Sequence, residues 1–162
     1  MKTLAAVFLA LMFVVFSAAG SVGQGARTIE LTGTTIQAGP LSLEDIQKFP
    51  LIEQEVQFQT SKGEEKGRYK GALLWVILEA KGIKTTGHNE QLKRTFVVEG
   101  SDGYQIAFSI GEIDPDFGNL PITIAIERDG QPMVPGEGFR LIVPGDKRGA
   151  RYVRDIVKID VR

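Results

Sequence analysis

Apolar and polar residues alternate in several short stretches of the chain, which is the pattern of half-buried β-strands. In residues 28–36, for example, Ile29 and Leu31 are separated by polar residues in a threonine-rich context. The segments that this pattern predicts as strands are 28–36, 53–60, 95–98, 104–108, 122–127, 139–143 and 152–161. The alternation changes phase within the last segment, which predicts a β-bulge there.

Two segments are predicted to be short helices. Ser42 is followed three positions later by Asp45, a loose form of the capping box, and the helix should end before Phe49-Pro50. Residues 71–80 are rich in leucine, isoleucine and valine, and Gly82 is a suitable C-cap, so a buried helix is expected.

The remaining segments are predicted as turns and loops, with residues 61–70 as a charged loop or exposed hairpin. The predicted turns are Gly39-Pro40, 100–103, Asp114-Pro115-Asp116, Asp129-Gly130 and Pro144-Gly145. Short strands with two inserted helices predict a β-rich α+β fold with a mixed sheet, in one domain over residues 27–162.

The N-terminal residues have the organisation of a signal peptide. Lys2 supplies positive charge, residues 4–16 are apolar, and small residues follow. Cleavage is expected after Ala19 or after Ala26, so residues 1–26 are assigned to a signal peptide and spacer, and the protein to the periplasm. An uncleaved membrane anchor is the alternative, although a permanent span needs about 20 apolar residues.

Charge and cysteine content exclude several classes of function. The chain has a net charge of −1. Loss of residues 1–26 removes one lysine and leaves 18 basic against 20 acidic residues, a net charge of −2. No general attraction to nucleic acid or anionic membrane is expected from that balance. The sequence contains no cysteine, so disulfides, cysteine nucleophiles and thiolate–metal bonds are all excluded.

Several segments, taken in order, resemble the sulfite-oxidase-like molybdopterin-binding superfamily. Tyr69-Lys70-Gly71 with the following leucines is similar to its W-x-G-V-P-L helix, and residues 139–145 to its P-x-R-L-V-V-P-G segment. The matching segments are 29–33, 41–46, 49–50, 69–74, 78–83, 102–104, 139–145, 153–154 and 159–161. The resemblance implies the same fold and a pterin pocket.

The departures from the family pattern bear on its chemistry. The family's enzymes bind molybdenum through a cysteine near the end of the strand before the W-x-G segment, where this chain has residues 57–62. A hydroxyl cannot replace a thiolate as a soft metal ligand at neutral pH. In the family's terminal V-K-W, lysine and tryptophan are Arg154 and Asp155 here. The chain thus resembles a cysteine-less branch, some members of which are periplasmic pterin-binding proteins that partner membrane-bound cyclic-di-GMP enzymes.

A basic cluster near the C-terminus is the densest candidate for ligand binding. The resemblance implies that residues of the P-x-R strand and its Pro-Gly loop contact the pterin and its phosphate. Arginine suits both, because its planar fork donates two parallel hydrogen bonds and stacks on flat rings. The alternative is a solvated face with nearby aspartates as partners. The cluster consists of Arg140, Lys147, Arg148, Arg151 and Arg154.

Two further groups complete the predicted site. Asp102 could pair with the pterin's amino group and ring N–H, or it could be only a turn former; Tyr104 could be a pocket wall or core. Thr60, Ser61 and Tyr69 are expected where the metal lies in an enzyme, as hydrogen-bonding groups or as inert surface.

Other conspicuous residues are interpreted structurally. Trp75 is predicted to be core, and His88, the only histidine, to be a solvent-exposed loop residue.

The sequence predicts a non-catalytic periplasmic pterin-binding protein that holds no molybdenum and signals its ligand state to the periplasmic part of a membrane signalling protein. No nucleic acid and no membrane insertion after signal cleavage are expected. The alternatives are a molybdenum-cofactor oxidoreductase subunit without the cysteine ligand and a ligand-free interaction scaffold.

Overall fold

A computed structural model describes residues 27–83, 89–134 and 136–162. The predicted signal peptide and His88 lie outside these residues. Among the helices of the described part, none has the length and apolar character needed to cross a membrane.

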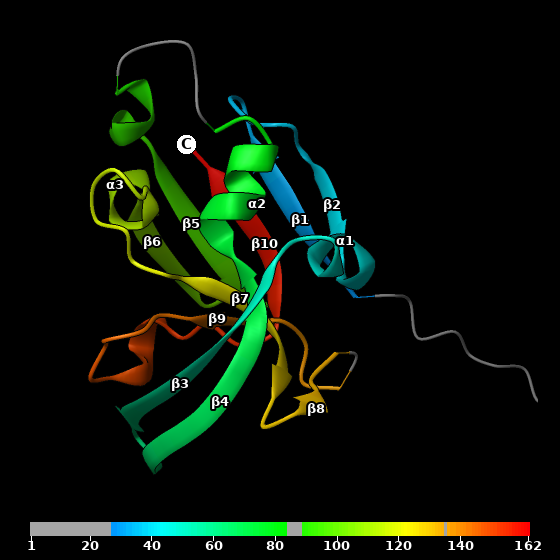
Figure 1. The fold of residues 1–162 in the computed structure, drawn as a ribbon, viewed down its shortest axis with the longest axis vertical. Coiled ribbons are helices and arrows are strands. Elements are labelled where there is room, and N and C mark those ends of the chain that lie inside the picture. Colours follow the sequence, from blue (N-terminus) through cyan, green and yellow to red (C-terminus); the bar gives the residue numbers. More distant parts are fainter. Residues whose placement is uncertain (1–26, 84–88, 135) are drawn as a thin grey trace, which may run out of the picture.

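The first sheet has five strands (Figure 1). Buried and exposed residues alternate along its strand at residues 28–31, as the sequence predicted. Its strand order is β2 (Gly39–Ser42), β1 (Thr28–Gly33), β10 (Ile156–Val161), β5 (Thr95–Gly100) and β6 (Gln105–Ser109). Strands β1 and β10 are parallel, which brings the two ends of the domain together in the middle of the sheet. The predicted bulge in the last strand is confirmed by a register shift between Ile156 and Lys158.

The second sheet is built on a long hairpin that curves below the first sheet (Figure 1). Its strands are β3 (Leu51–Thr60), β4 (Gly63–Leu73), β7 (Thr123–Arg128) and the short β8 (Gln131–Pro132), and β9 (Arg140–Ile142) also pairs with β7. Buried apolar residues from both sheets form one core, which includes Trp75 as predicted.

The helices are short, and two of the three described α-helices are capped by side chains. Helix α1 (Leu43–Gln47) begins with the predicted capping box of Ser42 and Asp45. Helix α2 (Leu74–Ala80) buries its aliphatic residues, and α3 (Ile110–Ile113) follows a second capping box, Ser109 with Glu112. The 3₁₀ turns are η1 (Glu90–Lys93) and η2 (Gly149–Arg151). The Ser-x-x-Glu spacing before α3 is a signal in the sequence that the periodicity analysis missed.

The structure corrects the prediction most strongly between residues 61 and 73. The charged segment 61–70, predicted as a loop or exposed hairpin, is the turn and part of the second strand of the β3–β4 hairpin, so the hairpin alternative is confirmed. The helix predicted from residue 71 begins only at Leu74. Strand β4 pairs with both β3 and β7, and these backbone hydrogen bonds stabilise it as a strand. Its polar composition alone does not predict a strand. Backbone pairing likewise places Gly39-Pro40, predicted as a turn, in the edge strand β2. The strand predicted from residue 152 starts at Ile156.

Gly71 lies where β4 changes register against β7, and the two backbones are in close contact there. A Cβ added to Gly71 would lie 2.0 Å from the carbonyl oxygen of Ile124, which is backbone and cannot move aside. The mutation Gly71→Ala is therefore expected to lower the free energy of unfolding by at least about 2 kcal/mol, measured by urea denaturation. Gly111→Ala is the matched control, since its nearest neighbour is the end of the Leu92 side chain at 3.3 Å. An equal loss in both variants would contradict this explanation.

Candidate functional site

Three segments that are distant in sequence meet at the tip of the long hairpin. They are the β3–β4 turn, the β5–β6 turn and the segment between β9 and β10. Gln59 donates its backbone N–H to the carbonyl of Lys147 (3.0 Å), and Gln59 and Arg148 form a parallel bridge. Phe58 stacks on Tyr152 with ring centroids 3.9 Å apart. These contacts fix the C-terminal segment against the end of β3.

A cavity of about 630 Å³ opens between the three segments, within the size range of small-molecule sites. We call it the hairpin pocket. Its lining consists of residues 59–62, 102, 104, 148–150 and 152–154.

The turns that border the hairpin pocket are fixed by their own side chains. The Thr60 hydroxyl donates to the carbonyl of Gly63 (2.8 Å) and accepts from the N–H of Lys62 (3.1 Å), so it is occupied in shaping the β3–β4 turn. Asp102 accepts from the N–H of Tyr104 at 3.0 Å, the local bond of a good turn former. One carboxylate oxygen of Asp102 is used in this way, and its other oxygen has no hydrogen bond to another described residue.

Tyr104 forms a wall of the pocket. Its side chain is 46 % exposed, so it is not core, and its hydroxyl donates to the carbonyl of Ala150 at 2.9 Å. This bond joins the β5–β6 turn to the C-terminal segment across the pocket. The structure thus decides between the two interpretations that the sequence left open for Tyr104.

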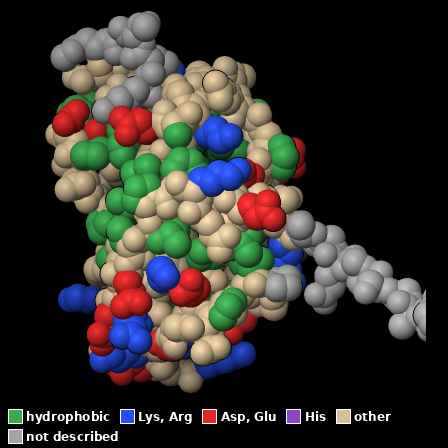
Figure 2. Space-filling view, turned by 45° about the vertical axis from the view of Figure 1, so that its right-hand side comes forward, with side chains coloured by type: hydrophobic (Ala, Val, Ile, Leu, Met, Phe, Trp, Pro, Cys, Tyr) green, Lys and Arg blue, Asp and Glu red, His purple; other side chains and the backbone are tan. Residues whose placement is uncertain are grey.

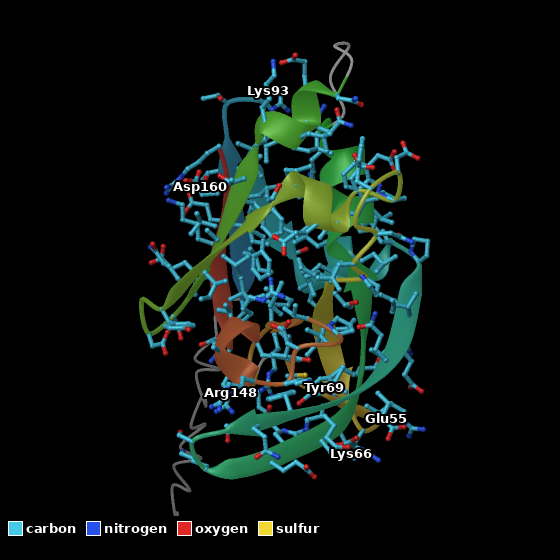
Figure 3. All side chains as sticks on the ribbon, turned by 90° about the vertical axis from the view of Figure 1, so that its left-hand side faces the viewer. Glu55, Lys66, Tyr69, Lys93, Arg148 and Asp160 are labelled. Atoms are coloured by element: carbon cyan, nitrogen blue, oxygen red, sulfur yellow. The ribbon has the colours of Figure 1, made fainter. Side chains whose placement is uncertain are left out.

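Two cations of the pocket have no ionic partner within residues 27–83, 89–134 and 136–162. They are Lys62, at the hairpin turn, and Arg148, which Figure 3 shows between the C-terminal segment and the hairpin. A third, Arg154, donates to Glu65 at 3.0 Å but is 63 % exposed. An anion entering the pocket would therefore meet guanidinium and ammonium groups that are not neutralised.

Tyr152 contributes a polar atom without a partner. Its ring is buried against Phe58, and its hydroxyl is buried with no hydrogen bond to any described residue. Burial, reinforced by the negative charge of Asp146, raises the pKa of Tyr152 to about 12. The hydroxyl is thus protonated at neutral pH and can donate to a ligand.

Arg140 and Tyr69 lie outside the hairpin pocket. Arg140 is 4 % exposed and donates from Nη1 to Glu65 (2.6 Å) and to the Tyr69 hydroxyl (2.9 Å). Tyr69 is fully buried and donates to Glu65 at 3.0 Å, and burial raises its pKa to about 12. These two side chains belong to a buried ionic cluster, whereas the sequence placed Tyr69 beside a ligand.

Arg151 and Lys147 also lie outside the lining of the pocket. Arg151 forms two parallel hydrogen bonds with Asp146 (2.7 and 2.6 Å) and a third with Glu112 (3.0 Å). The hydrogen bonds to Asp146 raise the pKa of Arg151, against the opposing effect of burial. Its donors hold the Pro-Gly loop to α3. Lys147 is exposed, and it contributes its backbone carbonyl to the contact with Gln59.

Six of the ten predicted site residues therefore line one pocket: Thr60, Ser61, Asp102, Tyr104, Arg148 and Arg154. Tyr69, Arg140, Lys147 and Arg151 do not line it. Whether any of the ten contacts a ligand stays a prediction. Sequence reasoning missed Lys62 and Tyr152. Lys62 carried a usable signal, since it lies in the hairpin turn beside Ser61, whereas Tyr152 was interpreted as the first residue of a strand.

The donor set of the pocket suits an organic anion and does not suit a soft metal. Hydroxyl, guanidinium and ammonium groups face it, and the sequence has no cysteine to supply a thiolate. Among the described residues, no group of three or more histidine, cysteine, aspartate or glutamate side chains lies close enough together to hold a metal ion. The chain therefore cannot supply a cysteine sulfur to a metal ion.

Comparison with known proteins places the fold. No protein-family model and no curated protein matches the chain. Among solved structures, it is similar to the sulfane dehydrogenase SoxCD from Paracoccus pantotrophus, with a TM-score of 0.66 and 18 % sequence identity over 83 % of this chain. The fold is sulfite-oxidase-like. The α+β, β-rich fold class predicted from the sequence is thereby confirmed.

The likeness is limited to the fold, because the identity is low and the match covers only 38 % of the SoxCD chain. The finer resemblance, to a cysteine-less pterin-binding branch, stays a prediction.

The ionic cluster below the pocket predicts how stability depends on pH. Burial raises the pKa of Glu65, but the hydrogen bond and charge of Arg140, the hydrogen bond from Tyr69 and the charge of Arg154 outweigh it and lower the pKa to about 2. Because the pKa in the unfolded chain is higher, this stabilisation is present above about pH 4.5 and is lost as the pH falls toward 2. Glu65→Gln is expected to cost about 3 kcal/mol at pH 7 and progressively less below pH 4.5, measured by urea denaturation at several pH values.

The exposed pair of Glu53 and Arg68 (3.5 Å) provides the control for this experiment. Glu53→Gln is expected to change the free energy of unfolding by less than about 1 kcal/mol at any pH. A cost for Glu65→Gln that does not change between pH 7 and pH 2.5 would argue against the ionic interpretation.

Proposed function

We propose that this chain is an exported, non-catalytic binding protein for a flat, anionic heterocycle of the pterin class, held in the hairpin pocket. One observation carries the proposal. In one pocket of a sulfite-oxidase-like fold, two cations without ionic partners among the described residues lie with the exposed ring of Tyr104, and Tyr152, whose buried hydroxyl has no hydrogen bond to a described residue, belongs to the same lining.

Each group has a role that its chemistry supports. Arg148 and Lys62 supply charge-assisted hydrogen bonds to the anionic substituent, and the fork of Arg148 also matches the carbonyl and ring nitrogen of a pterin edge. The free oxygen of Asp102 suits the ring's amino group. Tyr104 provides a flat wall for stacking, and Tyr152 donates from below.

The proposed lack of a catalytic role is supported by the absence of cysteine from the sequence. A thiolate is the protein ligand through which the resembling enzymes hold molybdenum, and this sequence contains none. The neighbour SoxCD is a dehydrogenase, so the alternative of a molybdenum-dependent oxidoreductase subunit is tested directly below.

The biological output of such a protein would be its ligand state. Residues 1–26 predict export to the periplasm, where a membrane signalling protein of the cyclic-di-GMP type could engage it. Such signalling requires that the partner bind the loaded and empty forms with different affinity.

A fluorescence titration with pterin-6-carboxylate tests the proposal, with the parent pterin as the matched ligand that lacks the anionic group. The carboxylate form is expected to bind at least about tenfold more tightly, because its charge meets Arg148 and Lys62. Arg148→Gln should weaken binding of the carboxylate form about tenfold and leave binding of the parent pterin nearly unchanged. Arg68→Gln, which removes an exposed arginine outside the pocket, is the control.

Tyr104 provides a second matched pair. Tyr104→Phe keeps the ring and should change the affinity by less than about threefold, whereas Tyr104→Ala removes the wall and should weaken binding about tenfold. A folded wild-type protein that binds neither pterin would contradict the proposal and favour the scaffold alternative. Stoichiometric molybdenum in protein isolated from its native envelope would favour the oxidoreductase alternative.

A further inference from the structure

A second cavity lies beside the ionic cluster, on the other side of Arg154. Its volume is about 340 Å³, and we call it the arginine cavity. It is lined by residues 65, 128, 133, 137, 140, 154 and 155, of which three are arginines and three are carboxylates. Arg154 is the only residue that lines both this cavity and the hairpin pocket, as far as the described residues show.

The guanidinium donors of the cavity exceed the acceptors available to them. All three arginines share the carboxylate of Glu65, with Arg140 at 2.6 Å, Arg154 at 3.0 Å and Arg128 at 3.4 Å. Each guanidinium carries five N–H groups, so one carboxylate cannot accept hydrogen bonds from all the N–H groups of three arginines. Arg128 has only one other carboxylate partner in the described structure, Asp129, at 3.5 Å.

The other two carboxylates of the cavity, Asp155 and Glu137, form no ion pair with its arginines in the described structure. Asp155 is paired with Arg27, and it also accepts a hydrogen bond from the Ser101 hydroxyl at 2.7 Å. Glu137 is exposed and forms no ion pair with any described residue. Glu65 is therefore the one carboxylate of the lining that pairs with these three arginines in the described structure.

One N–H donor of these arginines is buried and makes no hydrogen bond in the described structure. Nε of Arg140 is buried without a hydrogen-bond partner in the described structure, although the side chain is only 4 % exposed and lines the cavity. The guanidinium carbon lies 5.6 Å from the ring centroid of Phe58 and 5.3 Å from that of Tyr69, so the two rings restrict its movement. Buried donors almost always have an acceptor, and a charged donor without one is unfavourable.

We propose that the arginine cavity is a second binding site, for a small oxyanion such as the carboxylate group of a short organic acid. A carboxylate accepts two parallel hydrogen bonds from one guanidinium, and Arg140 and Arg128 offer guanidinium donors from the paired strands β9 and β7. The volume corresponds to roughly ten water molecules, which admits a short organic acid and excludes a polymer. Met133, which is buried, gives the cavity an apolar surface for the carbon chain of the acid.

The test uses the arginine Nε–Hε resonances of the ¹⁵N-labelled, exported protein. Sodium acetate is added at constant ionic strength, with sodium chloride as the reference salt. The Arg140 Nε–Hε signal is expected to shift downfield and to saturate with a Kd of about 1 mM, because this proton gains an acceptor. Inorganic phosphate is the second probe: competition with acetate shows that the site takes oxyanions generally, and no competition shows that it is restricted to carboxylates.

Variants separate this cavity from the hairpin pocket. Arg128→Gln is expected to weaken acetate binding at least about fivefold without loss of folding, because Arg128 is partly exposed and its ion pairs are long. Arg68→Gln, on strand β4 of the same sheet but outside the cavity, should leave the acetate affinity unchanged. Arg148→Gln should also leave it unchanged, so failure of the pterin proposal and failure of this one are distinguishable.

Three results would overturn the proposal. They are no saturable shift of the Arg140 signal with either anion in folded protein, the same shift with chloride alone, and an unchanged acetate affinity in Arg128→Gln.

Discussion

Glu65 holds together the part of the molecule on which both cavities depend. Its carboxylate, on β4, accepts hydrogen bonds from Arg140 on β9, from Tyr69 on its own strand and from Arg154 just before β10. A guanidinium as deeply buried as that of Arg140 is stable only with a carboxylate beside it, because burial of an uncompensated charge is very unfavourable. The long hairpin is thus fixed to the C-terminal segment by charge as well as by the stacking of Phe58 on Tyr152.

The two cavities lie on either side of this attachment and differ in how their charges are balanced. In the hairpin pocket, Lys62 and Arg148 are accessible and without ionic partners in the described structure, and aromatic side chains supply flat surfaces. In the arginine cavity, the cations are partly neutralised by Glu65, and the unused donor is buried. The first arrangement suits a ring with an anionic substituent, and the second suits a small acid. Acidic and basic side chains are intermixed on the face shown in Figure 2.

The fold of this chain and the cysteine ligand of the enzymes that it resembles are specified by different residues. The two sheets depend on the alternation of apolar residues and on backbone pairing, neither of which needs the cysteine that the resembling enzymes use. Where such an enzyme would present sulfur, this chain presents the end of β3 and the turn that the Thr60 hydroxyl closes. Loss of one ligand type therefore changes what the pocket can hold without changing its framework.

The sequence by itself determined the elements whose signals are local. The alternation in β1 and β10, the capping box of α1 and the burial of Trp75 depend on neighbouring residues, and all were predicted correctly. Only the tertiary structure decided the rest. Strand β4 exists because β3 and β7 pair with it, although its own composition is that of a loop. The basic residues near the C-terminus are alike in sequence, yet the packing commits Arg151 to Asp146, buries Arg140 beside Glu65 and leaves Arg148 open to the pocket. Long-range contacts determine which charges are neutralised, and a linear pattern contains no record of those contacts.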